Sequence, residues 1–345
     1  MIDYTWCRRL GEQDRAEATA LVEAAARYDE EAGFSVVSAR EVESVSTAER
    51  SVWHLPIKAR RGLSVRADAP LVMVGYLHLS IDPQGQGTVR YTVHPDYRSR
   101  GVTTLLVEEL GLDVGGADGW CGRGATSLRC WAYGSHPASE RLTRRFSIAP
   151  IARLWTMARH LAGPFAVPLA PAGFPGGMSI EGPVDLTDDA VVSKVRDVLA
   201  RQGLTQAQFE QFRAEFGERT GQVVIAAAGS DQPAGAVWFD PRPTRYLELR
   251  AAWVRALIVV PEIRGGGLGA ALITRAMHEL AAAGTQVVLM RIDPDDHSAV
   301  RLARLLSFEQ EEAHACHQIG EWDDVPDLSP NRGSGRAEDP ARDRR

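Results

Sequence analysis

Residues 259–270 of the 345-residue chain, VVPEIRGGGLGA, decide the fold. Apolar residues typical of a strand lead up to Pro261, and an amphipathic helical pattern follows Leu268. The glycines between them allow the main chain to approach an anion closely. The first amides of a helix have no partner within the helix, and together with the helix dipole they bind phosphate groups. The segment therefore predicts a strand–loop–helix unit with a phosphate-binding loop.

The same pattern occurs a second time, around Pro95, where the sequence is VHPDYRSRGVTTLL. An offset of 166 residues superimposes four pairs: Val93 on Val259, Pro95 on Pro261, Arg98 on Arg264 and Gly101 on Gly267. Just before these segments, GYLHL at residue 75 parallels GAVWF at residue 235. A repeat this long indicates duplicated domains rather than a solenoid.

The remaining sequence predicts a mixed α/β architecture in each half, because strand and helix patterns alternate. Strands are expected at 70–80, 88–94, 127–132, 153–161, 223–228, 234–239, 246–260, 286–292 and 308–319. Helices are expected at 14–31, 102–112, 136–146, 188–199, 205–216, 268–283 and 297–306. We expect an N-terminal domain over 1–161, a Pro/Gly-rich linker over 162–177, a C-terminal domain over 178–320 and a disordered tail over 321–345.

Composition excludes several classes of protein. The net charge of −6 argues against nucleic-acid binding through bulk positive charge, and no apolar run approaches the ~18 residues of a membrane-spanning helix. The four cysteines form no CxxC pair, so we expect reduced thiols and no metal site. We expect a cytoplasmic protein that is a monomer or a weak dimer and uses neither nucleic acid nor membrane as a partner.

The glycine-rich loop resembles the Q/R-x-x-G-x-G/A motif with which GNAT acetyltransferases bind the pyrophosphate of acyl-CoA. The C-terminal half matches at Arg264, Gly267 and Gly269, whereas the N-terminal half has Thr103 in the third motif position. The run from Asp296 to Phe308 is similar to a later family motif at three positions: Ala299, Leu302 and Phe308. The resemblance implies two tandem GNAT-like acyltransferase domains, each a mixed, mostly antiparallel sheet flanked by helices.

The resemblance also implies a co-substrate, acetyl-CoA or another acyl-CoA, and a small-molecule amine as acceptor. In the C-terminal half, the implied cofactor-binding residues are Leu257, Val259, Arg264, Gly265, Gly266, Gly267, Leu268, Gly269 and Ala270. In the N-terminal half they are Val93, Arg98, Ser99, Arg100, Gly101, Val102 and Thr103. Because its loop is complete, the C-terminal half is expected to be catalytic and the N-terminal half degenerate.

The side chains expected for acid–base chemistry are missing. Family members carry a Tyr that protonates the leaving thiolate, and this chain has Ala303 there in the C-terminal half, with Thr143 as the nearest counterpart in the N-terminal half. Where related tandem proteins carry a Glu base early in the fourth strand, this chain has Trp253 and, in the first half, Gly87.

Replacement residues can be named only as hypotheses. Glu248 is a hypothetical base, His297 a hypothetical acid, and Trp253 a residue of the acceptor cleft. Each has a plainer interpretation: a solvent-facing strand residue, a solvated residue at the start of a helix, and a packed core residue.

Four functions remain open. The first is acyl-CoA-dependent N-acyl transfer to a small molecule, and the second is a divergent tandem GNAT enzyme with another donor or acceptor in a specialised pathway. The third rests on GYLHL, VHPDYRSRG, WAYG and ARLWTMARHL, which resemble in content and order the N-terminal half of the mycothiol synthase family. The fourth is a non-catalytic acyl-CoA-binding protein.

Overall fold

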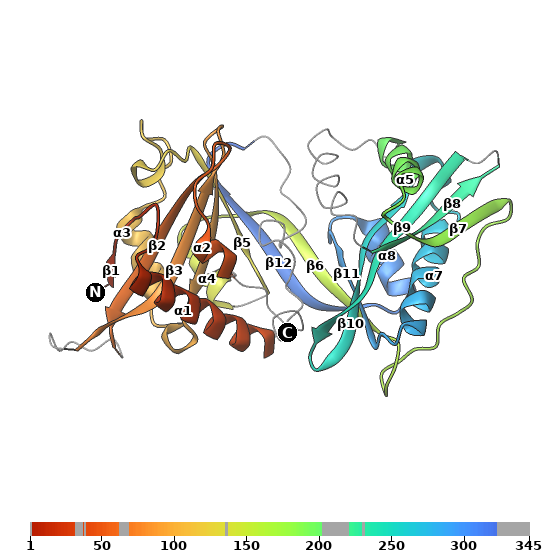
Figure 1. Ribbon diagram of the computed structural model, residues 1–345, viewed down its shortest axis with the longest axis horizontal. Coiled ribbons are helices and arrows are strands. Elements are labelled where there is room, and N and C mark those ends of the chain that lie inside the picture. Colours follow the sequence, from red (N-terminus) through yellow and green to blue (C-terminus); the bar gives the residue numbers. More distant parts are fainter. Residues whose placement is uncertain are drawn as a thin grey trace. The chain divides into compact units, whose positions relative to one another are not determined.

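The structure is a computed structural model that describes residues 2–31, 37, 39–61, 69–134, 137–201, 221–229 and 232–322. The chain forms two compact units. Unit 1 runs to Arg153 and resumes at His314, and unit 2 consists of Leu154–Ala313. Each unit is an α/β structure built on one half of the repeat (Figure 1).

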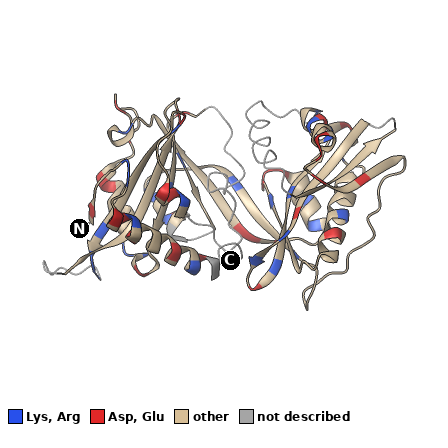
Figure 2. Cartoon of the chain, viewed as in Figure 1, with Lys and Arg blue, Asp and Glu red and all other residues tan. Residues whose placement is uncertain are grey.

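Unit 1 contains a sheet in the order β1-β2-β3-β4-β5-β12, in which only β4 and β5 are parallel. Its strands are β1 (Ile2–Tyr4), β2 (Ser51–Arg60), β3 (Leu71–Ile81), β4 (Gln86–Val93), β5 (Ser127–Ala132) and the last residues of β12 (Glu309–Ile319). Its helices are α1 (Glu12–Glu31), α2 (Ala39–Glu43), α3 (Val102–Leu110) and α4 (Pro137–Arg145), with short 3-10 turns η2 (Pro95–Tyr97) and η3 (Trp120–Gly122). Figure 2 shows that α1 carries residues of both charge signs.

Unit 2 repeats this plan in the order β6-β11-β10-β9-β8-β7, in which only β10 and β11 are parallel. Its strands are β6 (Pro150–His160), β7 (Met178–Asp185), β8 (Gln222–Ala228), β9 (Gln232–Tyr246), β10 (Leu249–Val259) and β11 (Val287–Ile292). Its helices are α5 (Asp189–Arg201), α7 (Leu268–Ala282) and α8 (His297–Leu305), with the turn η4 (Pro261–Ile263) before α7. The prediction of mixed, mostly antiparallel sheets flanked by helices is confirmed.

Each unit includes strand residues that lie far in the sequence from the rest of its sheet. In unit 1, the segment from Ala315 to Ile319 pairs antiparallel with β5, so the blue strand β12 lies beside β5 in Figure 1. In unit 2, the segment from Trp155 to His160 pairs antiparallel with β11. The sequence places the domain boundaries at 161 and 178, whereas the compact units divide the chain at Arg153 and again at Ala313.

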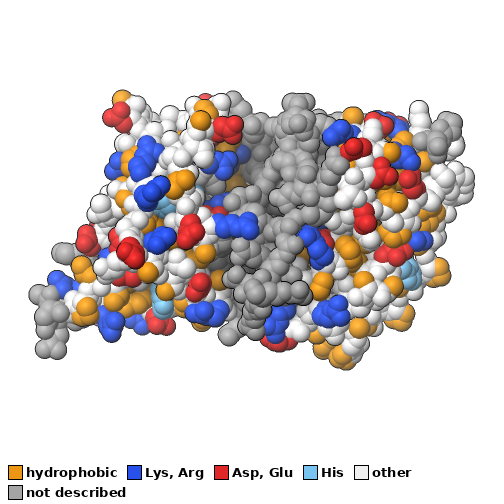
Figure 3. All heavy atoms as spheres, viewed as in Figure 1, with side chains coloured by type: hydrophobic (Ala, Val, Ile, Leu, Met, Phe, Trp, Pro, Cys, Tyr) orange, Lys and Arg blue, Asp and Glu red, His pale blue; other side chains and the backbone are white. Residues whose placement is uncertain are grey.

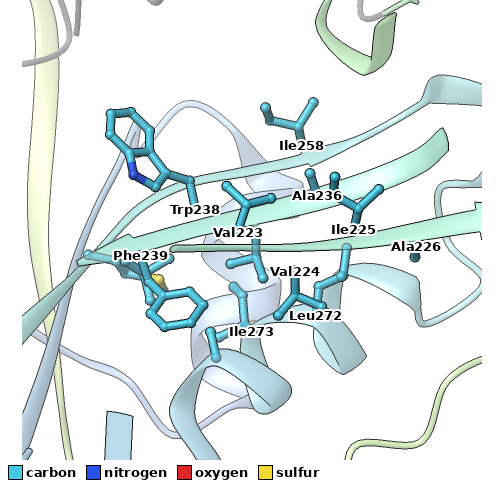
Figure 4. Close-up of a cluster of buried hydrophobic side chains, with 14 of the residues drawn as sticks. Val223, Val224, Ile225, Ala226, Ala236, Trp238, Phe239, Ile258, Leu272 and Ile273 are labelled. Atoms are coloured by element: carbon cyan, nitrogen blue, oxygen red, sulfur yellow. The ribbon is translucent and has the colours of Figure 1, made fainter. Parts of the chain in front are cut away.

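The core of unit 2 lies between its sheet and its helices. The buried run of β9 is apolar on both faces, and successive side chains alternate in direction, so that Trp238 and Phe239 project to opposite faces of the sheet (Figure 4). Leu272 and Ile273 of α7 pack in this core and are fully buried. Unit 1 has a corresponding core, which includes Leu55, Leu79 and Leu106.

Most of the expected elements are present within a few residues of their expected ends. Four elements were not expected from the sequence: β1, α2, β2 and β7. The segment 162–177 contains no helix or strand, since β6 ends at His160 and β7 begins at Met178. The expected helix over 205–216 and almost all of the expected tail over 321–345 lie outside the described residues.

Candidate active site

The glycine-rich loop of unit 2 joins β10 to α7. The loop takes left-handed backbone conformations at Gly265 (φ 83°) and Gly267 (φ 90°), which favour glycine. Space is open around both, because a Cβ at either position would meet no atom within 4 Å. Among the described residues, no main-chain acceptor outside the helix is bonded to the amides between Arg264 and Ala271. Open space and free amides at a helix N-terminus suit a phosphate group.

Unit 1 has the same turn in front of α3. Gly101 occupies the position of Gly267 with φ 83°, and Ser99 occupies the position of Gly265 with φ 58°. A left-handed conformation costs a non-glycine residue on the order of 1 kcal/mol, yet the turn is retained. The two loops therefore share one backbone geometry, as the repeat predicts.

The loop arginines anchor the loops to the preceding strands. Arg264 donates from Nε to the carbonyl of Val259 at 3.0 Å, and Arg98 donates from Nε to the carbonyl of Val93 at 3.0 Å. Arg98 also forms a bidentate ion pair with Asp29 of α1, whose carboxylate is buried. The assignment of both arginines to the pyrophosphate stays a prediction, and in the structure the Nε of each bonds to the main chain of the preceding strand.

A β-bulge lies in β10 at the point where its pairing with β11 stops. β10 pairs with β11 only from Ala251 to Val254, and a register shift against β9 follows between Val254 and Ala256. Arg255 is thus the extra residue of the bulge. The parallel strands β10 and β11 therefore stop pairing after Val254, next to the bulge.

The bulge sets the direction of the amides that follow it. The amide of Val260 donates to Ala234 of β9 at 3.0 Å, so alternate residues on this part of β10 bond to β9. Leu257 and Val259 consequently direct their N–H and C=O groups to the opposite side, beyond the end of the β11 ladder. This is where the sequence hypothesis expects them to pair with an acyl-CoA.

Unit 1 lacks this bulge. β4 pairs with β3 in continuous register from Gly87 to Val93, although its ladder with β5 also ends early, at Val89. Just beyond Val89, the Arg90 guanidinium forms an ion pair with the buried Glu41 carboxylate. The two halves therefore share the loop but differ in the strand before it.

The two halves also differ where the helix meets the strand. In unit 2 a Cβ at Gly269 would lie 3.3 Å from Cδ2 of Leu257, so glycine gives a close approach. In unit 1 the equivalent positions hold Thr103 and Tyr91, whose hydroxyl oxygens are 3.2 Å apart. In unit 1, the residue at the third motif position, Thr103, therefore forms a side-chain hydrogen bond to the preceding strand.

Trp253 lies next to the bulge. It pairs with Asp240 of β9 and with Leu289 of β11. The guanidinium of Arg291 lies 4.7 Å from its ring centroid and that of Arg255 lies 6.0 Å away, both within cation–π range. The structure therefore brings Trp253 close to the position where the strands part.

Glu248 is not brought to this site. It forms the β9–β10 turn with Leu247, both residues having positive φ, and its side chain is 84% exposed. It forms an ion pair with Arg245. Nine residues of strand, or roughly 30 Å, separate it from Leu257. The hypothesis that Glu248 is the base is not supported by this position.

His297 is the first residue of α8, where the side chain of Asp296 caps the helix by accepting from the amides of Ser298 and Ala299. Its side chain is exposed. Because α8 follows β11, which is parallel to β10, His297 lies at the same end of the sheet as the glycine loop. Ala303 is fully buried in the core, so its position offers no acid.

Asp240 was not predicted from the sequence as a residue of this site. Its carboxylate is buried beside the bulge, where it accepts from Arg242 and forms an ion pair with Arg255. A signal was present, because Asp240 begins the segment DPRP within a strand pattern, and prolines inside a strand indicate a bulge.

Comparison with known proteins identifies the family. Residues 192–308 match the model of the "Acetyltransferase (GNAT) family". A mycothiol acetyltransferase of Saccharomonospora viridis is 30% identical over 264 residues, which are 72% of this chain and 80% of the relative. The chain belongs to the GNAT acetyltransferase family. It is an acyltransferase, and the enzymes of this family use acetyl-CoA or another acyl-CoA as co-substrate.

The match extends over both halves of this GNAT protein. A mycothiol acetyltransferase of Actinosynnema mirum is 28% identical over 327 residues, which are 92% of this chain and 100% of the relative. A GCN5-related N-acetyltransferase from Sphaerobacter thermophilus has the same fold, with a TM-score of 0.61 at 19% identity, over 93% of this chain and 98% of its own. A tandem GNAT protein from the clavulanic acid biosynthesis pathway also has this fold, with a TM-score of 0.58 at 17% identity. The superposition covers 94% of this chain and 100% of that protein. The predicted tandem GNAT architecture is confirmed.

No helix in the described part of the chain is long and apolar enough to cross a membrane. The described residues contain no group of three or more His, Cys, Asp or Glu side chains arranged to hold a metal ion, and none of the four cysteines, all of which are described, forms a disulfide. On the face shown in Figure 3, basic and acidic side chains are interspersed on each unit.

Proposed function

We propose that unit 2 transfers an acetyl group from acetyl-CoA to the amine of a small molecule. The observation that carries the proposal is the bulge at Arg255, which is present in β10 and absent from β4. The bulge directs the amide of Leu257 away from β9, on the side where the pairing with β11 has ended, and the glycine loop follows on the same strand. Among the described strands, the one before the glycine loop of unit 2 is bulged and its counterpart in unit 1 is not.

The main chain supplies most of the binding groups in this proposal. The amides of Gly265–Gly269 bind the pyrophosphate at the start of α7, as free helix N-terminal amides do. Val259 pairs with the pantetheine arm in the manner of an added strand. The amide of Leu257 donates to the thioester carbonyl oxygen, on which negative charge develops during attack.

The chemistry is an acyl transfer between two bound groups. The neutral amine nitrogen attacks the carbonyl carbon, so that a C–N bond forms and the C–S bond breaks. The amine loses one proton and the coenzyme A thiolate gains one. Holding amine and thioester together supplies much of the rate, because effective molarities of about 10⁵ M or more are reached in well-oriented pairs. Because Ala303 stands where family members carry the acidic Tyr, the thiolate takes its proton from solvent in this proposal.

The acceptor in this proposal binds next to Trp253. The relatives named mycothiol acetyltransferase favour a small-molecule acceptor over a protein one. A mycothiol precursor amine is the second candidate acceptor, favoured by the match along the whole length of the Actinosynnema mirum protein. Trp253, in place of the Glu base that the resemblance implies, favours a different acceptor.

The test uses matched substitutions in the two loops. Gly266 has an ordinary φ, and a Cβ there would meet only the carbonyl oxygen of Ile263 at 3.5 Å. Gly266→Glu therefore adds a carboxylate to the loop of unit 2 without backbone strain, and Arg100→Glu does the same in unit 1. Acetyl-CoA affinity is measured by calorimetry, and release of coenzyme A is measured with a panel of small primary amines that includes a cysteine-derived amine.

We expect Gly266→Glu to abolish turnover and Arg100→Glu to preserve it. The opposite pattern would move the active site to unit 1. A wild-type protein that binds no acetyl-CoA would overturn the proposal, and tight binding with no transfer to any amine would leave an acyl-CoA-binding protein in its place.

A further inference from the structure

One buried carboxylate connects two irregular positions on neighbouring strands. Asp240 of β9 is only 4% exposed and pairs in register with Trp253 of β10. Its partners are Arg242, two residues further along β9, and Arg255, the bulged residue of β10. The carboxylate thus contacts both irregular positions at once.

The irregularity of β9 has its own cause. Between the pairs Thr244–Ala251 and Asp240–Trp253, three residues of β9 stand opposite the single residue Ala252. Two of the three are prolines, which have no N–H to donate to a ladder, and the third is Arg242. The strand therefore bulges, and the Arg242 side chain turns back onto Asp240.

The contacts to Asp240 are specific. Oδ1 accepts from Nε of Arg242 at 2.8 Å and from its main-chain amide at 3.1 Å, and Oδ2 accepts from a terminal nitrogen of the same guanidinium. Nη2 of Arg255 lies 3.7 Å from Oδ2. Burial alone would raise the pKa of this carboxyl, but the hydrogen bonds and charges of the two arginines lower it. Asp240 is therefore a charged bridge.

We infer that Asp240 is a positioning residue for acyl transfer, which acts through Arg255 to hold the bulge that aims the Leu257 amide at the thioester. The inference rests on the proposed function. Asp240 touches neither co-substrate nor acceptor in this scheme. It fixes the side chain at the bulge, and the bulge fixes the direction of the amides that follow. Loss of the bridge should therefore affect the polarisation of the carbonyl rather than the binding of the pyrophosphate, which depends on α7.

The sharpest test observes the thioester itself. Acetyl-CoA labelled with ¹³C at the carbonyl is bound to the full chain, and the ¹³C resonance of the bound form is compared with that of the free form. A hydrogen bond to the oxygen moves this resonance downfield. We expect a downfield shift in the wild type and a shift close to zero in Asp240→Asn, with the acetyl-CoA affinity unchanged within about twofold. The value of kcat should fall roughly 100- to 1,000-fold, as for the loss of one oxyanion donor.

Matched variants separate this role from a general loss of stability. Asp29→Asn removes another buried carboxylate that is paired with an arginine, Arg98, in unit 1, and it should leave the ¹³C shift and kcat unchanged. Arg255→Gln removes the other end of the bridge and should reproduce the effect of Asp240→Asn. Asp240→Glu keeps the charge and should restore part of kcat. Circular dichroism verifies that each variant is folded.

The outcomes distinguish this inference from the proposed function. If the wild type fails to bind acetyl-CoA, the proposed function fails, and the inference fails with it. If the wild type binds with a shifted carbonyl, and a folded Asp240→Asn or Arg255→Gln shows the same shift and the same kcat, the inference alone is overturned. Equal losses of affinity and kcat, with the shift unchanged, would also overturn it, because they indicate a merely structural role.

Discussion

The hydroxyl oxygen of Thr103 lies 3.2 Å from that of Tyr91, at the positions that Gly269 and Leu257 occupy in the other half of the chain. The pair occupies the junction of strand and helix in unit 1, where unit 2 brings its helix close to an aliphatic side chain. Burial raises the pKa of Tyr91, so its phenol stays protonated and able to donate at neutral pH. The two copies of the loop are thus held against the preceding strand by different contacts, a hydrogen bond in unit 1 and close apolar packing in unit 2.

Gly269→Thr should weaken the site of unit 2. A Cβ at this position would lie 3.3 Å from Cδ2 of Leu257 and 3.6 Å from that of Leu302, so the start of α7 must move outward. We expect a loss of about 1–3 kcal/mol in unfolding free energy, as in overpacked cores, and acetyl-CoA binding weaker by roughly tenfold. Calorimetry and urea unfolding measure the two effects. Thr103→Gly is the control, and it should leave turnover unchanged; equal affinities for Gly269→Thr and wild type would contradict the expectation.

Glu248→Gly should stabilise the protein without loss of turnover. Glu248 has φ 66° in a two-residue turn, a conformation that glycine adopts without steric cost. Its ion pair with Arg245 is exposed and contributes little. We expect the thermal midpoint to rise, by an amount that corresponds to about 0.5–1 kcal/mol. A fall in kcat of tenfold or more would return Glu248 to the list of catalytic bases.

The stability of unit 1 should fall in mild acid because of His78. Its side chain is 3% exposed, with Nε2 2.8 Å from Oγ of Ser44. Burial, aided by the charge of Arg90, lowers its pKa to about 3. Because the folded pKa lies below the unfolded value, stability is fully present above about pH 6.5 and is lost progressively as the pH falls toward 3.

At pH 5 the contribution of His78 to this loss should be about 2 kcal/mol. Urea unfolding at pH 7.5 and pH 5 measures it, and His78→Gln should reduce the difference between the two. His297→Gln changes an exposed histidine and serves as the control. An equal pH dependence in wild type and His78→Gln would refute the assignment.

Removal of the chain from His314 onward should destabilise unit 1 rather than unit 2. The deletion takes away the strand that pairs with β5, including Cys316, which is fully buried. Hydrogen exchange should then show faster exchange at the amides of β5, while β10 and β11 stay protected. A chain that ends at Trp322 keeps β12 and is the control. Unchanged protection of β5 in the shorter chain would show that the pairing contributes no stability.

The sequence predicted those parts of the fold that depend on local pattern. The duplicated loop, its two helices and the buried strands follow from glycine positions and apolar periodicity, and all are present. Leu257 and Val259 were placed correctly on the strand before the loop, because the offset between the halves sets their register. β2 was missed although it is buried, since Pro56 interrupts its strand pattern.

The side chains of the site could not be predicted as well, because their roles depend on contacts between residues far apart in sequence. Glu248 lies on the expected strand pattern, but a two-residue turn at Leu247 carries it to the surface. The prolines after Asp240 indicate a bulge but not a role for its carboxylate, since that role arises from Arg255 on the next strand. The pairing of β6 with β11 and of β12 with β5 could not be predicted either, because periodicity identifies a strand but not the strand beside it.

The pairing of β12 with β5 has a consequence for how the protein is made. The strand that completes the first sheet, Ala315–Ile319, leaves the ribosome after nearly all of unit 2 has been synthesised. Until then, β5 has an exposed edge that is open to pairing with other chains. The sheet of unit 1 therefore cannot be completed until residues 315–319 have been synthesised. A chaperone that shields an open sheet edge should raise the yield of native protein more than one that binds isolated helices.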